Sequence, residues 1–240
     1  MNKFVKGYVL NITKYKENDG IVSILTSSGI ESYKARAIYK LNSKFGNLLQ
    51  SFMYGEFEIC YPLENQISFI KDIQDYKINK SIYSDFNKFT LLSFVAESIL
   101  KDPDLSNKFL IFDTVFKMID QDNYNFKNIV LIVLKNHLLS NGSLLEADCC
   151  CKCGKKNNVV AVSFKDGGFL CSNCNPNPSF IKPNEFLIAY RYVIKADITK
   201  SNSFTISDEI FKELFALMYD ELVNNVGIKL NTESLLLENM

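Results

Sequence analysis

The chain has 240 residues, of which 47% are hydrophobic and 22% charged, and its 27 basic and 27 acidic side chains cancel to no net charge. This composition is typical of a soluble globular protein and argues against a uniformly basic polyanion-binding chain. The longest apolar run, at 129–134, is far too short to span a membrane, and the N-terminal segment contains no secretory h-region. We therefore expect a cytoplasmic protein, in which clustered cysteines bind metal more often than they form disulfides.

The charge is nevertheless unevenly distributed along the chain. Residues 1–80 carry 11 basic and 8 acidic side chains, and residues 149–184 carry 5 basic and 1 acidic, whereas the remaining segments are acidic. A polyanion should therefore contact the first segment or the second basic segment.

The first 80 residues predict a small closed barrel. The expected strands are 4–12, the two arms of 20–39, 54–61 and 67–73. Ser27-Ser28-Gly29 forms the hairpin turn inside the second run, a Gly/Asn/Ser-rich loop covers 42–47, and a turn at Pro62, Glu64 and Asn65 precedes the last strand. Five strands with short turns and no internal helix fit an OB-like or an SH3-like barrel.

From about residue 84 the apolar residues recur at helical spacing. The expected helices are 84–102, 107–121, 125–142, 184–197 and a last helix that begins at Ser207. Ser207 can act as the N-cap, because Asp208 and Glu209 follow it in the first turn. We expect the apolar stripe of the last helix to pack in the core rather than to form a partner groove. The stripe consists of Phe211, Leu214, Phe215, Met218 and Leu222.

Six of the seven cysteines lie between residues 149 and 174. Cys150 and Cys153 form one C-x2-C pair and Cys171 and Cys174 a second, and this arrangement is typical of a tetrahedral zinc site. The residues between the pairs predict a β-hairpin, so the segment has the layout of a zinc ribbon. Gly154 permits the left-handed backbone that such a knuckle often requires.

Cys149 and Cys151 are surplus to four-fold coordination. Pairing Cys149 with Cys151, or Cys151 with Cys153, would leave a one-residue gap, which is less usual for zinc. Four thiolates close the coordination shell and leave no open position for a substrate, so we expect the metal to be structural.

No pattern of residues predicts an active site. The zinc-deaminase signature requires H-x-E, whereas the only histidine, His137, is followed by two leucines. We expect His137 to lie on a helix face, without a metal or catalytic role. Walker A and nucleophile-elbow motifs are absent from the sequence as well.

Three stretches resemble the bacterial RecO family of recombination mediators. They are "GYVLNITKYKENDGIVSILTSSGI" (7–30), "ARAIYKLNSKFGNLLQSF" (35–52) and "CKCG…FKDGGFLCSNC" in the cysteine segment. The resemblance implies an OB-fold that binds single- and double-stranded DNA and promotes annealing. It also implies partnership with RecR and with the acidic C-terminal tail of single-stranded DNA-binding protein, so that RecA is loaded onto coated strands. For localisation it implies the bacterial cytoplasm, in association with the nucleoid.

The residues of the barrel agree with this resemblance, because cations and rings alternate in 31–44, as single-strand binding requires. The expected DNA-binding residues are Lys14, Tyr33, Lys34, Arg36, Tyr39, Lys40 and Lys44. The sequence departs from the family pattern where "LQSF" replaces Leu-Gln-Pro-Phe and where "IYK" thins the usual basic cluster.

We therefore expect an α+β multidomain chain with a five-stranded OB-like barrel in 1–80 and a helical domain in 81–240, into which a four-cysteine zinc ribbon is inserted at 148–180. The expected function is non-enzymatic mediation of DNA repair. One alternative is a protein-interaction scaffold with a structural zinc and no direct DNA binding. The other is a metal-dependent enzyme, which would need an open metal site.

Overall fold

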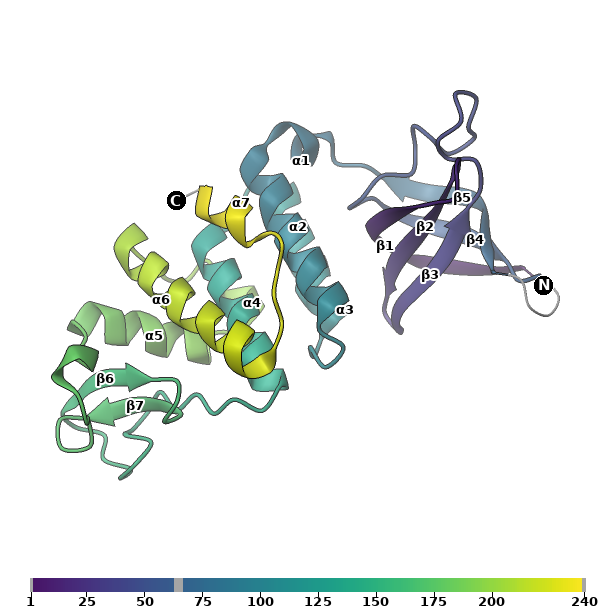
Figure 1. Ribbon diagram of the computed structural model, residues 1–240. Coiled ribbons are helices and arrows are strands. Elements are labelled where there is room, and N and C mark those ends of the chain that lie inside the picture. The colour runs from purple at the N-terminus through teal and green to yellow at the C-terminus, as the bar shows by residue number, and fades with distance from the viewer. Residues whose placement is uncertain (1, 63–66, 239–240) are drawn as a thin grey trace. The chain divides into compact units, whose positions relative to one another are not determined.

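The computed structural model describes residues 2–62 and 67–238 of the chain. The chain forms two compact units (Figure 1). The first unit comprises Met1–Leu92 with Lys108–Phe112, and the second comprises Ser93–Asn107 with Asp113–Met240.

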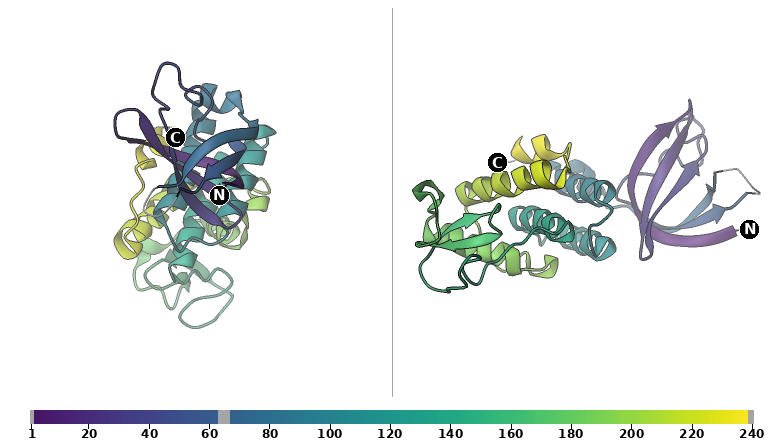
Figure 2. Two further views of the ribbon diagram at one scale, coloured as in Figure 1. Left: turned by 90° about the vertical axis from the view of Figure 1, so that its right-hand side faces the viewer. Right: turned by 60° about the horizontal axis from the view of Figure 1, so that its bottom comes forward.

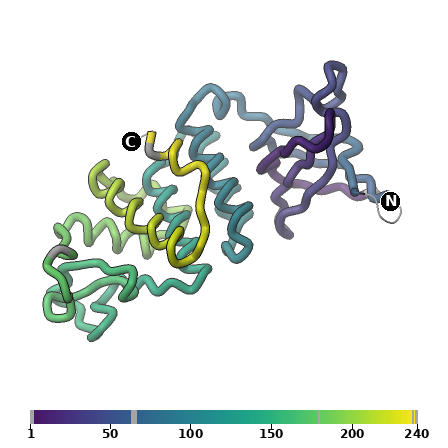
Figure 3. Tube along the Cα trace, in the orientation of Figure 1, coloured from purple at the N-terminus to yellow at the C-terminus, as the bar shows by residue number. Residues whose placement is uncertain are grey.

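The first unit contains the five-stranded closed barrel that the sequence predicts. Its strands are β1 (Asn2–Tyr15), β2 (Asp19–Thr26), β3 (Gly29–Ala35), β4 (Tyr54–Cys60) and β5 (Phe69–Lys77), in the order β1-β2-β3-β5-β4. The long β1 pairs antiparallel with both β2 and β4, as the tube in Figure 3 allows the reader to follow. The expected turn at Glu64 and Asn65 lies outside the described residues.

Alternation along the strands produces the barrel core. In β4, Phe57 and Ile59 are fully buried while Glu56, Glu58 and Cys60, which alternate with them, are partly exposed. In β3, Tyr33 and Ala35 point into the same core and Lys34 points away from it. A period of two residues thus separates the interior of the barrel from its surface.

The third strand ends earlier than the sequence suggests, at Ala35 instead of residue 39. Ala37 adopts a left-handed backbone with φ of 54°, which a continuing strand does not permit. The N–H of Ala37 donates to Oδ1 of Asp19 at 2.7 Å, so this N–H is bonded to a carboxylate and not to the backbone carbonyl of a neighbouring strand. The chain therefore leaves the barrel here and forms a long loop up to residue 53.

The barrel closes between β3 and β5 through a short parallel seam. Among the described residues, the two strands share a single register pair, Lys34 with Phe69. The N–H of Lys34 donates to the carbonyl of Ser68 at 2.9 Å beside this pair.

The remaining chain is largely helical, as predicted. After the short α1 (Lys80–Ser84), the helices are α2 (Phe86–Lys101), α3 (Lys108–Asp120), α4 (Phe126–Ser140), α5 (Asn184–Lys195), α6 (Asp208–Glu221), the π-helical turn Leu222–Val226 and α7 (Glu233–Glu238). Ser207 caps α6 by accepting a hydrogen bond from the N–H of Ile210 at 3.4 Å. The apolar stripe of α6 is buried, which confirms its place in the core. No helix among the described residues has the length and apolarity needed to cross a membrane.

His137 is a buried helix residue that holds α2 and α4 together. Its Nδ1 lies 2.6 Å from Oδ2 of Asp102, and both side chains are fully buried. The other oxygen of Asp102 accepts hydrogen bonds from the N–H groups of Asp104 and Leu105, just beyond the end of α2. The histidine thus belongs to the packing of the helical unit.

Candidate metal centre and nucleic-acid interface

The cysteine segment folds as a small ribbon. Strands β6 (Val159–Ser163) and β7 (Gly168–Cys171) pair antiparallel, and the ribbon lies next to α5 (Figure 2). The rings of Phe169 and Tyr190 are 5.1 Å apart between β7 and α5. Glu146 exchanges backbone hydrogen bonds with Gly167 and Phe169, at 2.8 and 2.9 Å, and so aligns the first cysteine pair with β7.

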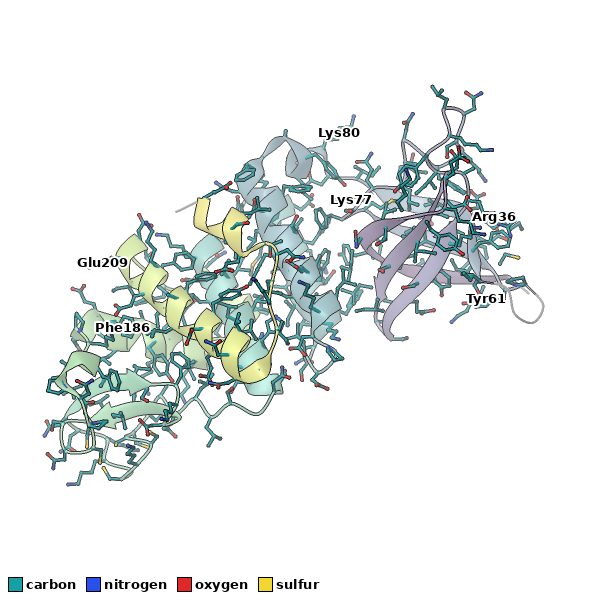
Figure 4. All side chains as sticks on the ribbon, viewed as in Figure 1. Arg36, Tyr61, Lys77, Lys80, Phe186 and Glu209 are labelled. Atoms are coloured by element: carbon teal, nitrogen blue, oxygen red, sulfur yellow. The ribbon has the colours of Figure 1, made fainter. Side chains whose placement is uncertain are left out.

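The ribbon brings together the four cysteines that the spacing singles out. The Sγ atoms of Cys150, Cys153, Cys171 and Cys174 all lie within 4.8 Å of one another. Figure 4 shows the sulfur atoms gathered at the end of the ribbon. Cys149 and Cys151 do not belong to this group.

The spacing of these sulfur atoms fits a tetrahedral metal ion. Two thiolates bound tetrahedrally at about 2.3 Å lie about 3.8 Å apart. The Sγ atoms of Cys153 and Cys171, one from each pair, are 3.7 Å apart. An ion placed between these two sulfur atoms can therefore contact one cysteine of each pair.

Each pair sits on a tight turn that directs both thiols toward one point. In the first, the N–H of Gly154 donates to the carbonyl of Cys150 at 2.8 Å, and Gly154 has the expected left-handed backbone, with φ of 71°. In the second, the N–H of Cys174 donates to the carbonyl of Cys171 at 3.0 Å.

The surroundings of Cys150 favour its thiolate form. Burial raises the pKa of this thiol, but the backbone N–H groups of Cys171, Cys153 and Lys152 stabilise the thiolate and lower the pKa to about 6. Because metals bind the thiolate rather than the thiol, this electrostatic environment suits a ligand.

The second candidate site lies on the barrel, where the end of β1 meets the loop after β3. Lys14 places its Nζ atom 5.9 Å from the ring centre of Tyr39, so two of the predicted residues lie together. The N–H of Tyr39 donates to the carbonyl of Asn18 at 3.1 Å, which fixes the loop to the β1–β2 turn. Both Lys14 and Tyr39 are exposed.

Lys34, near the end of β3, and Arg36, just beyond it, extend this surface. Lys34 forms an ion pair with Asp19 at 2.7 Å, and its Nζ atom also lies 5.5 Å from the ring centre of Tyr15. The guanidinium carbon of Arg36 lies only 3.5 Å from the ring centre of Phe69, in a stacked cation–π contact. Arg36 is exposed and is labelled on the barrel in Figure 4.

Asp19 holds two parts of this surface in place through its carboxylate. A hydrogen bond from Lys34 and another from the N–H of Ala37 hold the pKa of the Asp19 carboxyl below its usual value. Its negative charge therefore fixes both the cation and the start of the loop.

Of the remaining predicted DNA-binding residues, two lysines are exposed and one tyrosine is buried. Lys40 and Lys44 are exposed on the loop, and Lys44 pairs with Asp72 at 2.9 Å. Tyr33 is only 3% exposed, and its hydroxyl lies 3.2 Å from that of Tyr61. Its ring is thus part of the barrel core and has no free face for a base, because it shares the inward side of β3 with Ala35.

Sequence reasoning missed the rings that support these cations. Tyr15 and Phe69 come from β1 and β5, and only the pairing of the strands brings them beside Lys34 and Arg36. Tyr15 lies beyond the predicted strand 4–12 and Phe69 lies inside the predicted strand 67–73, so their positions in the sequence did not single them out.

Comparison with known proteins agrees with this architecture. The family model "Recombination protein O N terminal" matches residues 1–79, and "Recombination protein O C terminal" matches residues 83–233. A DNA repair protein RecO of Thermoanaerobacter sp. (strain X514) is 25% identical over 242 residues, covering 93% of each chain.

Two further relatives have similar coverage. The DNA repair protein RecO of Shouchella clausii is 27% identical and covers 90% of this chain and 87% of its own length. That of Bacillus subtilis is 24% identical and covers 90% and 88%. Since the two family models together match nearly the whole chain, it belongs to the RecO family of DNA repair and recombination proteins, which are recombination mediators and not enzymes.

Proposed function

We propose that this chain binds single- and double-stranded DNA through the barrel surface around Lys14, Arg36 and Tyr39, and promotes the annealing of complementary strands. The observation that carries the proposal is the set of exposed cations held beside aromatic rings at one end of the barrel. Cations contact phosphates and rings stack on bases, and each stacked base contributes about 1–3 kcal/mol.

The zero net charge of the chain affects how DNA binding at this surface should depend on salt. Because no long-range positive field surrounds the protein, binding should depend on a few short-range phosphate contacts, so the affinity should be modest and should fall as salt rises, with a slope set by the number of those contacts. Loose binding suits a protein that brings two strands together and then releases them.

We further propose that the four clustered cysteines hold one structural Zn²⁺. When bound, the ion supplies a cross-link between the two cysteine turns and no reaction, because four thiolates fill a tetrahedral shell. The four residues themselves fix the hairpin against the segment that leads from α4, which shapes this face of the helical unit. The proposed domains are 1–80 for the barrel and 81–240 for the helical part with its ribbon at 148–180.

The proposed protein partners are RecR and the acidic C-terminal tail of single-stranded DNA-binding protein, with loading of RecA as the outcome. A pocket of about 270 Å³ beside the ribbon supports the second of these. It is lined by apolar side chains including Leu187 and Ile188, and by Lys156, Arg191 and Asp148, of which Arg191 and Asp148 form an ion pair at 2.8 Å. An apolar floor with Lys156 at its edge suits a short peptide that carries both acidic and apolar side chains.

Two binding measurements test the proposal. Fluorescence anisotropy with a single-stranded oligonucleotide across a salt series should give an affinity that falls as salt rises, and absent binding or a flat salt dependence would leave only a protein-interaction scaffold. A pull-down with the acidic tail peptide should retain the wild type and lose Ile188→Ser; equal retention of both would remove this pocket from the proposal.

A further inference from the structure

The loop between β3 and β4 presents Leu41 entirely to solvent. Its relative exposure is 106%, the highest of the large apolar side chains among the described residues. A single exposed leucine is ordinary on a protein surface. Leu41, however, lies at the apex of a loop that is held at both ends and that carries cations on both sides of the apex.

The two legs of the loop are anchored in the barrel. Ile38 and Phe45 both belong to the buried core of the barrel, one on each side of the apex. The legs approach so closely that a side chain at Gly46 would lie 2.8 Å from the carbonyl oxygen of Ile38. Within the apex, the N–H of Ser43 donates to the carbonyl of Lys40 at 3.0 Å. The apex is therefore a defined projection and not a free coil.

The flanks of the apex are aromatic and basic. Tyr39 is 49% exposed and lies beside Lys14. Lys40 is exposed and forms no ion pair among the residues that the structure describes. Lys44 pairs with Asp72, but both side chains are substantially exposed, so a phosphate can replace the carboxylate at little cost.

We propose that this loop, residues 39–44, recognises the junction between single- and double-stranded DNA, and that Leu41 covers the open face of the last base pair. The inference rests on the proposed DNA binding and adds a preferred substrate to it. An aliphatic side chain offers no ring for a single base, but it fits the broad apolar face that a base stack exposes only where the duplex ends. Leucine and similar side chains also contact base faces in proteins that kink DNA, where they are inserted between partly unstacked base steps.

The neighbouring residues fit this geometry. Tyr39, on the side of Lys14, is placed to stack on the first unpaired base, and Lys40 and Lys44 stand on either side of Leu41 to meet the phosphates of the two strands. Such a junction forms wherever annealing strands meet, so the loop would hold the protein at the point where pairing advances.

The test uses the full chain and a forked DNA with 2-aminopurine at the last base pair of the duplex. We expect the wild type to lower the 2-aminopurine fluorescence, because a covered terminal pair frays less, and to bind the fork about tenfold more tightly than a single strand of equal length. Leu41→Ser should lose the fluorescence change and the preference but keep its affinity for the single strand. Leu41→Met should retain both.

Leu144→Ser is the matched control, because Leu144 is also highly exposed, at 77%, but lies in the helical unit. It should behave as the wild type does, and the melting temperatures of all variants should agree because neither leucine is buried. A fork preference that survives in Leu41→Ser, or a loss that affects fork and single strand equally, overturns the inference and leaves the proposed function intact. A wild type that binds no DNA at all overturns both.

Discussion

The two basic segments of the chain serve different purposes in the structure. In the ribbon, Lys152 is paired with Asp166 at 3.0 Å and Lys182 with Glu213 at 2.5 Å, so part of the positive charge is neutralised locally. On the barrel, Lys34 and Lys44 are likewise paired with Asp19 and Asp72, but Lys14 and Arg36 lie beside aromatic rings. The charge of a segment therefore does not say how much of it a partner can use, since the neighbouring side chains decide that.

The ribbon and the barrel surface are also held together by different interactions. The ribbon is organised by four thiols around one point, whereas the barrel surface is organised by strand pairing and carries exposed side chains. Damage to one site should therefore leave the other working, and the following variants test that independence.

The largest expected effect is the loss of metal from the ribbon. Cys150→Ser or Cys171→Ser should abolish stoichiometric zinc, because each removes one of the four thiolates, whereas Cys149→Ser should retain it. Elemental analysis measures the content, and X-ray absorption should show four sulfur ligands. Affinity for a single strand should persist in all three variants.

Two results would contradict this assignment. Equal loss of zinc from Cys149→Ser would mean that the ligand set is wrong. Loss of DNA binding along with the metal would show that the ribbon and the barrel surface depend on each other.

Removal of a core side chain from the barrel should destabilise the barrel and leave the zinc in the ribbon. Phe57 is fully buried, so Phe57→Ala should lower the free energy of unfolding of the barrel by about 3–5 kcal/mol, as measured with urea, while zinc stays bound. Phe4→Ala is the matched control, because Phe4 is 52% exposed on the same barrel and its loss should have little effect. Equal destabilisation by both variants would contradict the burial pattern.

A smaller effect is expected for the surface itself. Arg36→Ala should weaken single-strand binding by about 3- to 10-fold and reduce the magnitude of the salt slope by roughly 0.7, the value for one phosphate contact. Arg191, the only other arginine, provides the control, because it donates to Asp148 at 2.8 Å in the helical unit. Anisotropy titrations should show Arg191→Ala close to the wild type, and a larger loss there than in Arg36→Ala would move the interface to the ribbon.

The smallest effect concerns pH. The pKa of Asp19 is lowered in the folded protein, first by the hydrogen bond from Lys34 and then by that from Ala37, so the carboxylate stabilises the fold above its unfolded pKa of 3.8. This contribution is lost as the pH falls through the lowered folded pKa. Asp19→Asn should therefore melt slightly below the wild type at neutral pH, and the difference should shrink as the pH falls below 3.8. A difference in melting temperature that persists in acid would mean that the packing of the side chain, and not its negative charge, causes the loss of stability.

The sequence predicted the cluster of four cysteines better than the arrangement of the barrel surface, because the residues that define the cluster lie in two short turns, whereas those of the surface come from separate strands. Two C-x2-C turns define the thiol cluster locally, so the spacing alone identified Cys150 and its three partners. The stacking partner of Arg36 depends on β3 lying beside β5, which the order of the strands along the chain does not reveal.

Tyr33 shows that some of the missing information was present in the sequence. Lys34 and Arg36 alternate with Tyr33 and Ala35 along β3, and two residues of such a strand that are two apart face the same side. If the cations face solvent, the tyrosine must face the core, where the structure places it. The apex position of Leu41 could not be predicted, because the left-handed turn at Ala37 depends on Asp19 from another strand.

The single register pair between β3 and β5 gives the barrel a preferred place to open. Separating these two strands breaks fewer ladder hydrogen bonds among the described residues than separating any other neighbours in the barrel. The local free energy of opening should therefore be lowest along this line, where amide hydrogens exchange soonest. Arg36 and Phe69 are in contact across the same line, so a ligand that binds both residues would raise the free energy needed to separate β3 from β5.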